Sequence, residues 1–181
     1  MVGQILKSSD PAHTYLRSSF VEKLVEHVFI SEVLQEAWYR FGKVVEVLRS
    51  EVDSSGFDVV FECGGVVRHV QLKTSRPKAK AASQKVNVAL AAKPSGCVVW
   101  MMRAEDAGAC RMTLSYRFFG GAVGEKLPSL DEFKFAKHTK GDATGKKAER
   151  PNVRVVPKRK FRAVGTTGEL VALLFGFSQV G

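Results

Sequence analysis

The chain has 181 residues, 45% hydrophobic and 25% charged, a composition that excludes a disordered or fibrous protein and suits one globular domain, residues 1–181, with a buried core. Its net charge of +10, from 28 Lys and Arg against 18 Asp and Glu, favours a polyanionic partner. The longest apolar run, residues 97–102, is too short to span a membrane and the N-terminus has no signal-peptide pattern, so we expect a cytoplasmic protein.

The first predicted element is a long helix over residues 19–41. Ser19 is a good N-cap residue, and Gly42 ends the pattern. Residues 44–50 (VVEVLRS) favour a strand, followed by a polar turn. The helix prediction depends on apolar residues at helical spacing: Phe20, Leu24, Val28, Val33, Leu34 and Trp38.

Residues 57–75 (FDVVFECGGVVRHVQLKTS) predict a tight hairpin. Gly64 and Gly65 lie between two β-rich runs, and a two-residue turn needs positive φ at both positions. Cys63 then faces Val66. Continued to the open end of the hairpin, the same register sets Asp58 opposite Gln71.

Alternation along the hairpin predicts one nearly all-apolar face and one polar face. The apolar face is Phe57, Val59, Phe61, Cys63, Val66, Val70 and Leu72, with Arg68 as the exception. The other face is Asp58, Val60, Glu62, Val67, His69, Gln71 and Lys73, so an acid, an amide and an amine converge. One interpretation is an ordinary solvent-facing hairpin with a weak ion pair; the other is a functional cluster in a sheet covered on both faces.

After the hairpin, residues 81–96 (AASQKVNVALAAKPSG) favour a helix ended by Pro94 and Gly96. Residues 97–104 favour a buried strand, and residues 113–119 a further strand. Residues 119–160 suggest loops with short strands, and residues 168–177 a closing helix. The order helix, three strands, helix, strand predicts a mixed α/β layer fold.

Two basic segments flank this predicted core. The first, residues 73–85, has no acidic residue, and the second covers residues 134–162. They are either solvated surfaces or a track for phosphates. Four nearby aromatic residues, Phe118, Phe119, Phe133 and Phe135, are expected in the core rather than as stacking platforms. The candidate nucleic-acid-binding residues are Arg76, Lys78, Lys80, Lys137, Lys140, Lys146 and Lys147.

The three cysteines, Cys63, Cys97 and Cys110, are odd in number and scattered along the chain. This spacing supports neither a disulfide framework nor a zinc site of the CxxC type. We expect them to be reduced, structural thiols.

The hairpin and its flanking elements resemble the PD-(D/E)XK nuclease superfamily, in the Asp…Gln-x-Lys form of Mrr-type endonucleases and related bacterial domains. Asp58 matches the aspartate of the second strand, and Gln71-Leu72-Lys73 matches the (D/E)-x-K motif with glutamine in the acidic position. For the carboxylate of the first helix, Glu32 is the first choice and Glu36 the alternative. The resemblance covers about residues 19–104 and implies a restriction-endonuclease-like αβββαβ core, a mixed sheet flanked by helices; the basic part from about residue 111 to 181 is an extension without a motif.

The resemblance implies a DNA endonuclease that hydrolyses phosphodiester bonds with Mg²⁺ or Mn²⁺. Its metal would be held by Asp58, Glu32, Gln71 and the Leu72 carbonyl, and Lys73 would position the attacking water. Cutting both strands is easier for a homodimer. Gln71 supplies no negative charge, so the alternative is an inactive nuclease-like module that binds nucleic acid or a protein. His69, Thr74 and Ser75 are either structural or contact the substrate.

Overall fold

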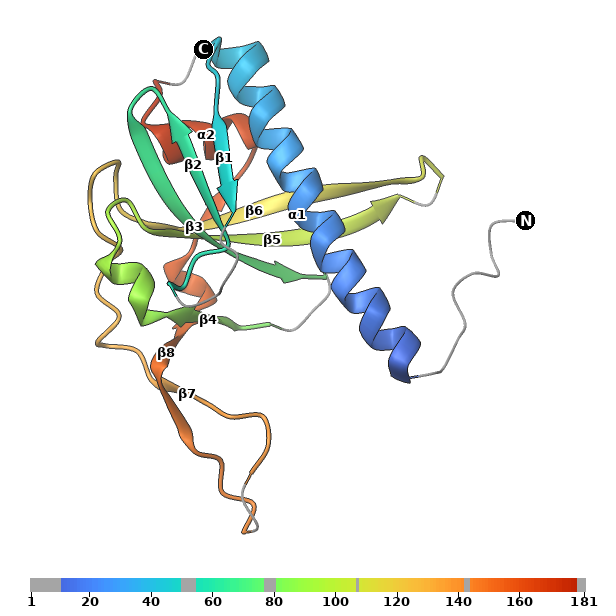
Figure 1. Cartoon of the computed structure of the whole chain (residues 1–181), viewed down its shortest axis with the longest axis vertical. Coiled ribbons are helices and arrows are strands. Elements are labelled where there is room, and N and C mark those ends of the chain that lie inside the picture. The colour runs from blue at the N-terminus through green and yellow to red at the C-terminus, as the bar shows by residue number, and fades with distance from the viewer. Residues whose placement is uncertain (1–10, 50–54, 77–80, 107, 142–143, 179–181) are drawn as a thin grey trace.

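The computed structural model of the chain describes residues 11–49, 55–76, 81–106, 108–141 and 144–178. These residues form a mixed α/β structure with two α-helices, two 3-10 helices and nine strands (Figure 1). The elements in chain order are α1 (Pro11–Phe41), β1 (Glu46–Arg49), β2 (Val59–Cys63), β3 (Val66–Ser75), β4 (Ser83–Asn87), η1 (Val88–Ala92), β5 (Cys97–Asp106), β6 (Arg111–Gly120), β7 (Phe135–Lys137), β8 (Glu149–Pro157), η2 (Lys158–Lys160), β9 (Arg162–Val164) and α2 (Thr167–Phe175).

The larger of two sheets has six strands in the order β1-β2-β3-β5-β6-β9. Neighbouring strands in it are antiparallel, except that β3 and β5 are parallel. The connection between β3 and β5 leaves this sheet and supplies β4 to a three-stranded sheet of order β4-β8-β7. The crossover therefore joins the two sheets.

The β2–β3 hairpin has the predicted turn and register. Cys63 pairs with Val66 and Val59 with Val70, and the two turn glycines, Gly64 and Gly65, have φ of 58° and 81°. Glycine populates this left-handed region without steric cost, which explains the two-residue turn. Regular pairing begins at Val59, one residue later than the prediction required.

Helices α1 and α2 pack on one face of the larger sheet and form the helix-side core with it. The buried stripe of α1 contains Val25, Phe29, Val33 and Ala37, which are four residues apart along the helix. The predicted helix is confirmed in its course and its end, but it begins at Pro11, so Ser19 lies inside it and is not its N-cap. Three of the apolar residues that predicted it do not belong to the buried stripe: Phe20, Leu24 and Trp38 are 66%, 39% and 57% exposed. Neither described helix combines the length and apolar character needed to cross a membrane.

The closing helix is also confirmed, as α2. Its N-cap residue Thr166 accepts a hydrogen bond from the Glu169 N–H, and Gly176 ends it in the left-handed conformation. Near that end, the Leu173 carbonyl accepts a hydrogen bond from Arg68, whose side chain is fully buried. Arg68 also donates to the carbonyls of Gly121 and Ala122, so backbone oxygens accept from both of its terminal nitrogens, whereas its buried Nε has no hydrogen-bond partner among the described residues.

The other face of the larger sheet is covered at β5 and β6 by the smaller sheet, η1 and the adjoining loops, whereas Glu62 and Val67 of the β2–β3 hairpin are exposed. Buried apolar residues from both sheets and the adjoining loops form this second core: Val86, Leu90, Val98, Trp100, Phe119, Leu127, Leu130, Val156 and Phe161. The helix predicted within residues 81–96 is wrong, because residues 83–87 form β4 and only residues 88–92 form a 3-10 helix. Pairing with β8, about 70 residues later in the chain, overrides the helical preference of the alanines.

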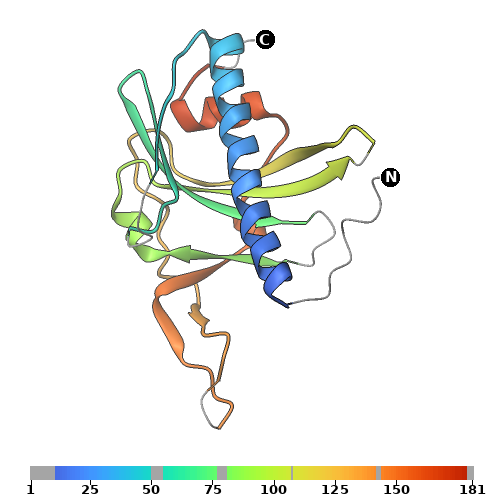
Figure 2. The same ribbon diagram turned by 45° about the vertical axis from the view of Figure 1, so that its right-hand side comes forward.

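The predicted loops and short strands of residues 119–160 are confirmed, and they include a protruding hairpin. We call the described residues of 134–154 the arm; they comprise β7, its connection and most of β8. The views in Figures 1 and 2 agree that the arm extends away from the helices. Val153 and Val156 near the inner end of β8 are buried, whereas residues 149–152 are exposed.

Candidate functional site

Asp58 lies at the entrance to β2, against the backbone of β3. Its N–H donates to the Val70 carbonyl at 2.9 Å, and its Oδ2 accepts the Leu72 N–H at 2.6 Å. The regular ladder ends at Val59, so the predicted direct pairing of Asp58 with Gln71 does not form. The Asp58 carboxylate instead lies beside the residue between Gln71 and Lys73.

The irregular start of β2 also changes the face on which Phe57 lies. Phe57 packs on the second core, not on the predicted apolar face, because alternation holds only inside the regular ladder. Its ring lies 5.0 Å from that of His69, in an edge-on arrangement. The Nδ1 of His69 is 3.2 Å from the Pro94 carbonyl, so His69 has structural neighbours on both sides.

Gln71 is buried, with 5% of its surface exposed. Its Oε1, the oxygen predicted to contact a metal, accepts the backbone N–H of Asn87 at 3.3 Å. Asn87 ends β4 and accepts the Ala89 N–H, which starts η1. It also packs so tightly on Gly56 that a Cβ there would lie 2.9 Å from two of its side-chain carbons. Gln71 therefore helps to attach the smaller sheet.

Lys73 is half-buried and lies beside Trp100 in the parallel pairing of β3 with β5. Two residues further along β3, the hydroxyl of Ser75 accepts hydrogen bonds from Trp100 Nε1 at 3.0 Å and Gln84 Nε2 at 3.3 Å. Gln71, Lys73 and Ser75 share a strand face by alternation. Two of the three, Gln71 and Ser75, bond to residues of β4.

Glu32 lies on the opposite side of the larger sheet. Its carboxylate accepts hydrogen bonds from the Tyr116 hydroxyl and, at 3.2 Å, from Thr167 Oγ1. Tyr116 belongs to the helix-side core. Burial and the hydrogen bond to Glu32 raise the pKa of Tyr116 far above its usual value, so it remains a donor.

The alternative carboxylate, Glu36, pairs with Arg40 one helical turn away. It also lies against the start of α2, where a Cβ on Gly168 would be 2.5 Å from its Oε1. The hydrogen bonds and ion pairs described for Glu32 and Glu36 are thus with residues other than Asp58 and Gln71.

A magnesium site requires several oxygen ligands that converge on one point. Within the described ranges, no three His, Cys, Asp or Glu side chains are close enough to hold a metal ion. The oxygens of Asp58, Gln71 and Glu32 named above accept hydrogen bonds from three different parts of the fold. The described residues therefore do not fit the implied Mg²⁺ or Mn²⁺.

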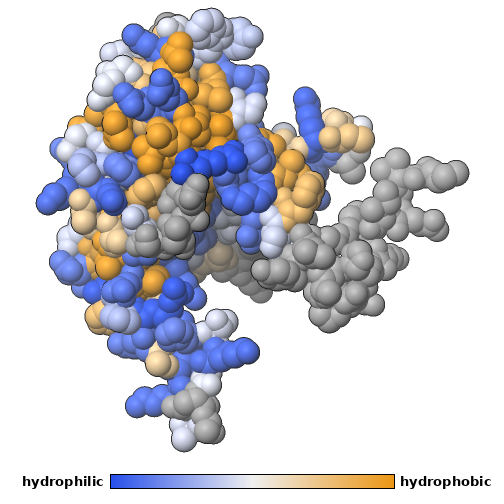
Figure 3. Space-filling view, in the orientation of Figure 1, coloured by the Kyte–Doolittle hydropathy of each residue, from blue (hydrophilic) through white to orange (hydrophobic). Residues whose placement is uncertain are grey.

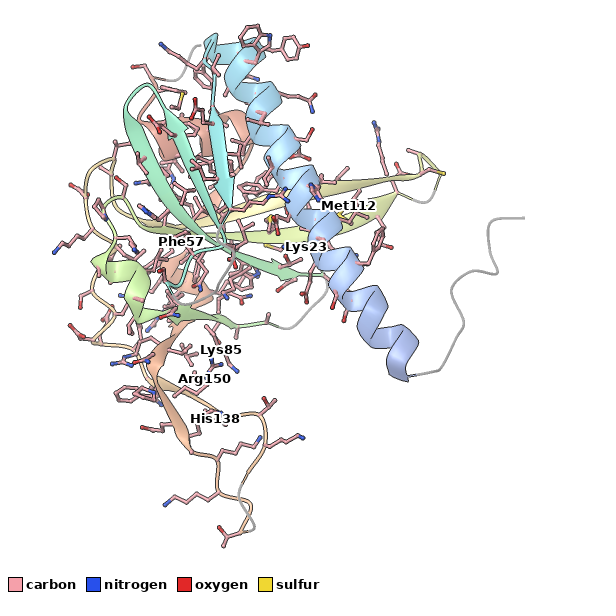
Figure 4. All side chains as sticks on the ribbon, viewed as in Figure 1. Lys23, Phe57, Lys85, Met112, His138 and Arg150 are labelled. Carbon is pink, nitrogen blue, oxygen red and sulfur yellow. The ribbon has the colours of Figure 1, made fainter. Side chains whose placement is uncertain are left out.

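The second basic segment forms the arm. Lys137, Lys140, Lys146 and Lys147 are all exposed there, and Figure 4 shows Lys85, Arg150 and His138 one after another from β4 outward. The arm's surface is mostly hydrophilic in Figure 3. Arg76, from the first segment, is exposed after the end of β3. Lys78 and Lys80 lie outside the described residues.

Hollows of about 440 and 470 Å³ lie near the end of the arm. The first is lined by His138, Lys140 and Lys146, among others, and the second by Lys137, Lys146 and Lys147. Each is lined by two or more lysines. Such an arrangement suits an anionic group.

The cations of the arm are gathered on one hairpin. Among the described residues, no carboxylate forms an ion pair with any of six arm cations: Lys134, Lys137, Lys140, Lys147, Arg150 and Arg154. Outside the arm, Lys160 and Arg162 pair with glutamates, whereas Lys126 and Arg159 form no ion pair with a described residue. The arm therefore differs from the remaining surface in how closely its cations follow one another, not in their lack of partners.

One feature of the arm contradicts the sequence prediction. Phe118 and Phe119 are buried as expected, but Phe135 is 40% exposed and lies outside both cores. The guanidinium carbon of Arg154 lies 3.7 Å from its ring centroid. Alternation around Ala136, which is buried, is the sequence signal that sets Phe135 on the outer side.

We compared the chain with models of protein families, with curated proteins and with solved structures, and none of the three comparisons gives a match.

Proposed function

We propose that this protein binds nucleic acid through the arm. The observation that carries the proposal is the gathering of exposed lysines on a hairpin that extends from the body of the fold. Among them, Lys134, Lys137, Lys140 and Lys147 form no ion pair with a described carboxylate. A net charge of +10 adds long-range attraction for a polyanion. Binding should therefore depend strongly on salt, because each phosphate contact releases counterions.

The test is the binding of a labelled DNA duplex, measured by fluorescence anisotropy over a range of salt concentrations. We expect a steep linear fall of log K with log salt, and a slope smaller by about 2 for the double variant Lys137→Ala/Lys140→Ala, since each lost phosphate contact removes about 0.9. The matched control is Lys23→Ala, which removes an exposed lysine paired with Glu26 on α1. The proposal is refuted if the affinity does not change with salt concentration, or if the double variant has the same affinity and salt slope as Lys23→Ala.

A second candidate is cleavage of the bound nucleic acid by a core of the PD-(D/E)XK type. It is favoured by the contact of the Asp58 carboxylate with the Leu72 backbone, next to Lys73. The long α1, the β1-β2-β3 meander and the parallel pairing of β5 with β3 also suit such a core. Against it, the crossover contains β4 and η1 in place of a second α-helix, and Glu32 bonds to Tyr116 on the other side of the sheet.

Cleavage is tested by incubating plasmid and short duplexes with the protein in Mg²⁺, Mn²⁺ or EDTA. Binding without cleavage predicts intact DNA with every metal. DNA cut by the wild type but not by Asp58→Ala or Lys73→Ala establishes the nuclease function instead. Equal cutting by all three proteins indicates a contaminating enzyme.

A further inference from the structure

Phe135 and Arg154 form a stacked pair on the surface of the arm. Phe135 of β7 pairs with Arg154 of β8 in the three-stranded sheet, and the guanidinium lies 3.7 Å from the ring centroid, well inside the range of a cation–π contact. The pair joins a planar cation to an aromatic ring that is 40% exposed. Together they make a flat, positively charged surface.

The pair is held in place before any ligand binds. Nη1 of Arg154 donates to the Pro151 carbonyl at 2.7 Å, which fixes the plane of the guanidinium over the ring. No carboxylate in the described part of the chain forms an ion pair with it. Little side-chain entropy is lost when a ligand stacks on such a fixed surface.

The pair joins two strands of the arm but contributes to neither hydrophobic core. Phe135 lies outside both cores. Phe133, two residues earlier, is different: it packs on the second core, with its ring 6.4 Å from that of Phe119. An exposed aromatic ring on a hairpin that also carries exposed lysines has the composition of a site for a base and its flanking phosphates.

We propose that the arm takes a single-stranded segment of nucleic acid, with one base stacked on the Phe135–Arg154 pair and adjacent phosphates on the arm lysines. This inference rests on the proposed nucleic-acid binding and adds the strand state of the ligand. A duplex keeps its bases stacked inside, whereas a single strand offers the flat face of a base to an exposed ring. The hollows near the arm's end suit the phosphates.

The experiment compares three ligands of equal length, about 12 nucleotides: a single strand, its duplex, and an abasic strand with the same phosphates. Affinity is measured at fixed salt for the wild type and for Phe135→Leu, Arg154→Lys and Phe133→Leu. Arg154→Lys keeps the positive charge but replaces the planar guanidinium with an ammonium group, on which a base cannot stack. Phe133→Leu is the matched control, because it shortens a phenylalanine that packs on the core.

We expect the wild type to prefer the single strand over the abasic strand by roughly 5- to 150-fold, the range for stacking of one base. Phe135→Leu should remove most of that preference, Arg154→Lys should reduce it, and Phe133→Leu should retain it. Equal wild-type affinity for the single and abasic strands overturns the stacking inference while leaving phosphate binding intact. A preference for the duplex overturns it as well. Absence of salt-sensitive binding to all three ligands refutes the proposed function itself.

Discussion

Glu32→Ala separates a structural role of this glutamate from the metal-ligand role that the family resemblance implies. The carboxylate connects three elements, since it lies on α1 and accepts hydrogen bonds from Tyr116 of β6 and Thr167 of α2. If it has this structural role, its removal lowers the free energy of unfolding whether or not a metal is present. If Glu32 instead only binds a metal, its removal in the absence of metal should leave the free energy of unfolding unchanged or raise it, because an uncompensated negative charge is lost.

The magnitude follows from the two hydrogen bonds. A net contribution of about 1.5–3 kcal/mol is usual for a hydrogen bond to a charged group, and a buried donor without an acceptor costs about 1–3 kcal/mol. The Tyr116 residue is only 3% exposed, so its hydroxyl has little access to water when Glu32 is removed. We therefore expect Glu32→Ala to destabilise the protein by about 2–4 kcal/mol, and Tyr116→Phe by about 1.5–3 kcal/mol.

The assay is urea unfolding followed by tryptophan fluorescence, for the two single variants and the double variant. The double variant should be less destabilised than the sum of the two single effects, with a coupling of about 1–3 kcal/mol. Glu22→Ala, at an exposed position of α1, should change stability by less than about 0.5 kcal/mol. A Glu32→Ala protein as stable as wild type, combined with loss of metal-dependent cleavage, refutes the structural role.

The remaining predictions concern pH, backbone conformation and thiol reactivity. Because the pKa of Tyr116 is raised by burial while an unfolded tyrosine ionises near pH 10, the free energy of unfolding should fall as pH rises above about 10, and less so in Tyr116→Phe; equal alkaline slopes contradict this. Gly42→Ala, at φ 61° in open space, should cost about 1–2 kcal/mol in thermal or urea unfolding. Gly56→Ala, at φ 75° against Asn87, should cost about 1–3 kcal/mol more because of crowding, and equal costs exclude that crowding. Mass spectrometry after iodoacetamide treatment of the native protein should find the exposed Cys110 alkylated before Cys97, which is fully buried and whose pKa burial raises to about 11; labelling of both at one rate contradicts the fold.

Features that are determined by residues close together in the sequence were predicted correctly. The β2–β3 register followed from two glycines and strict alternation, both of which are local. The helix α2 followed from the apolar run within residues 168–177, and the structure adds its caps, Thr166 and Gly176. Strand β4 was missed because its partner, β8, comes about 70 residues later, and an alanine-rich segment on its own favours a helix.

The candidate site was predicted less well, for the same reason. The closeness of Asp58 to residues 71–73 was correctly expected, but an irregularity at one residue replaced direct pairing with a bond to the Leu72 N–H. Glu32 could not be placed from helical spacing alone, because its partner Tyr116 is 84 residues away. The exposure of Phe135 follows from alternation about the buried Ala136, but this signal could be used only if residues 135–137 were already known to form a strand.

The inner part of strand β8 lies in the second core and its outer part lies in the exposed arm. We therefore expect the amide hydrogens of the two parts to exchange at different rates. The buried Val153 and Val156 lie where the strand pairs with β4, so their amides should exchange only in large openings of the second core. The amides of Glu149, Arg150 and Asn152 lie in the exposed arm and should exchange through small local fluctuations. Exchange in the outer part of the strand would then report on local opening of the arm, and exchange at Val153 and Val156 on the stability of the folded body.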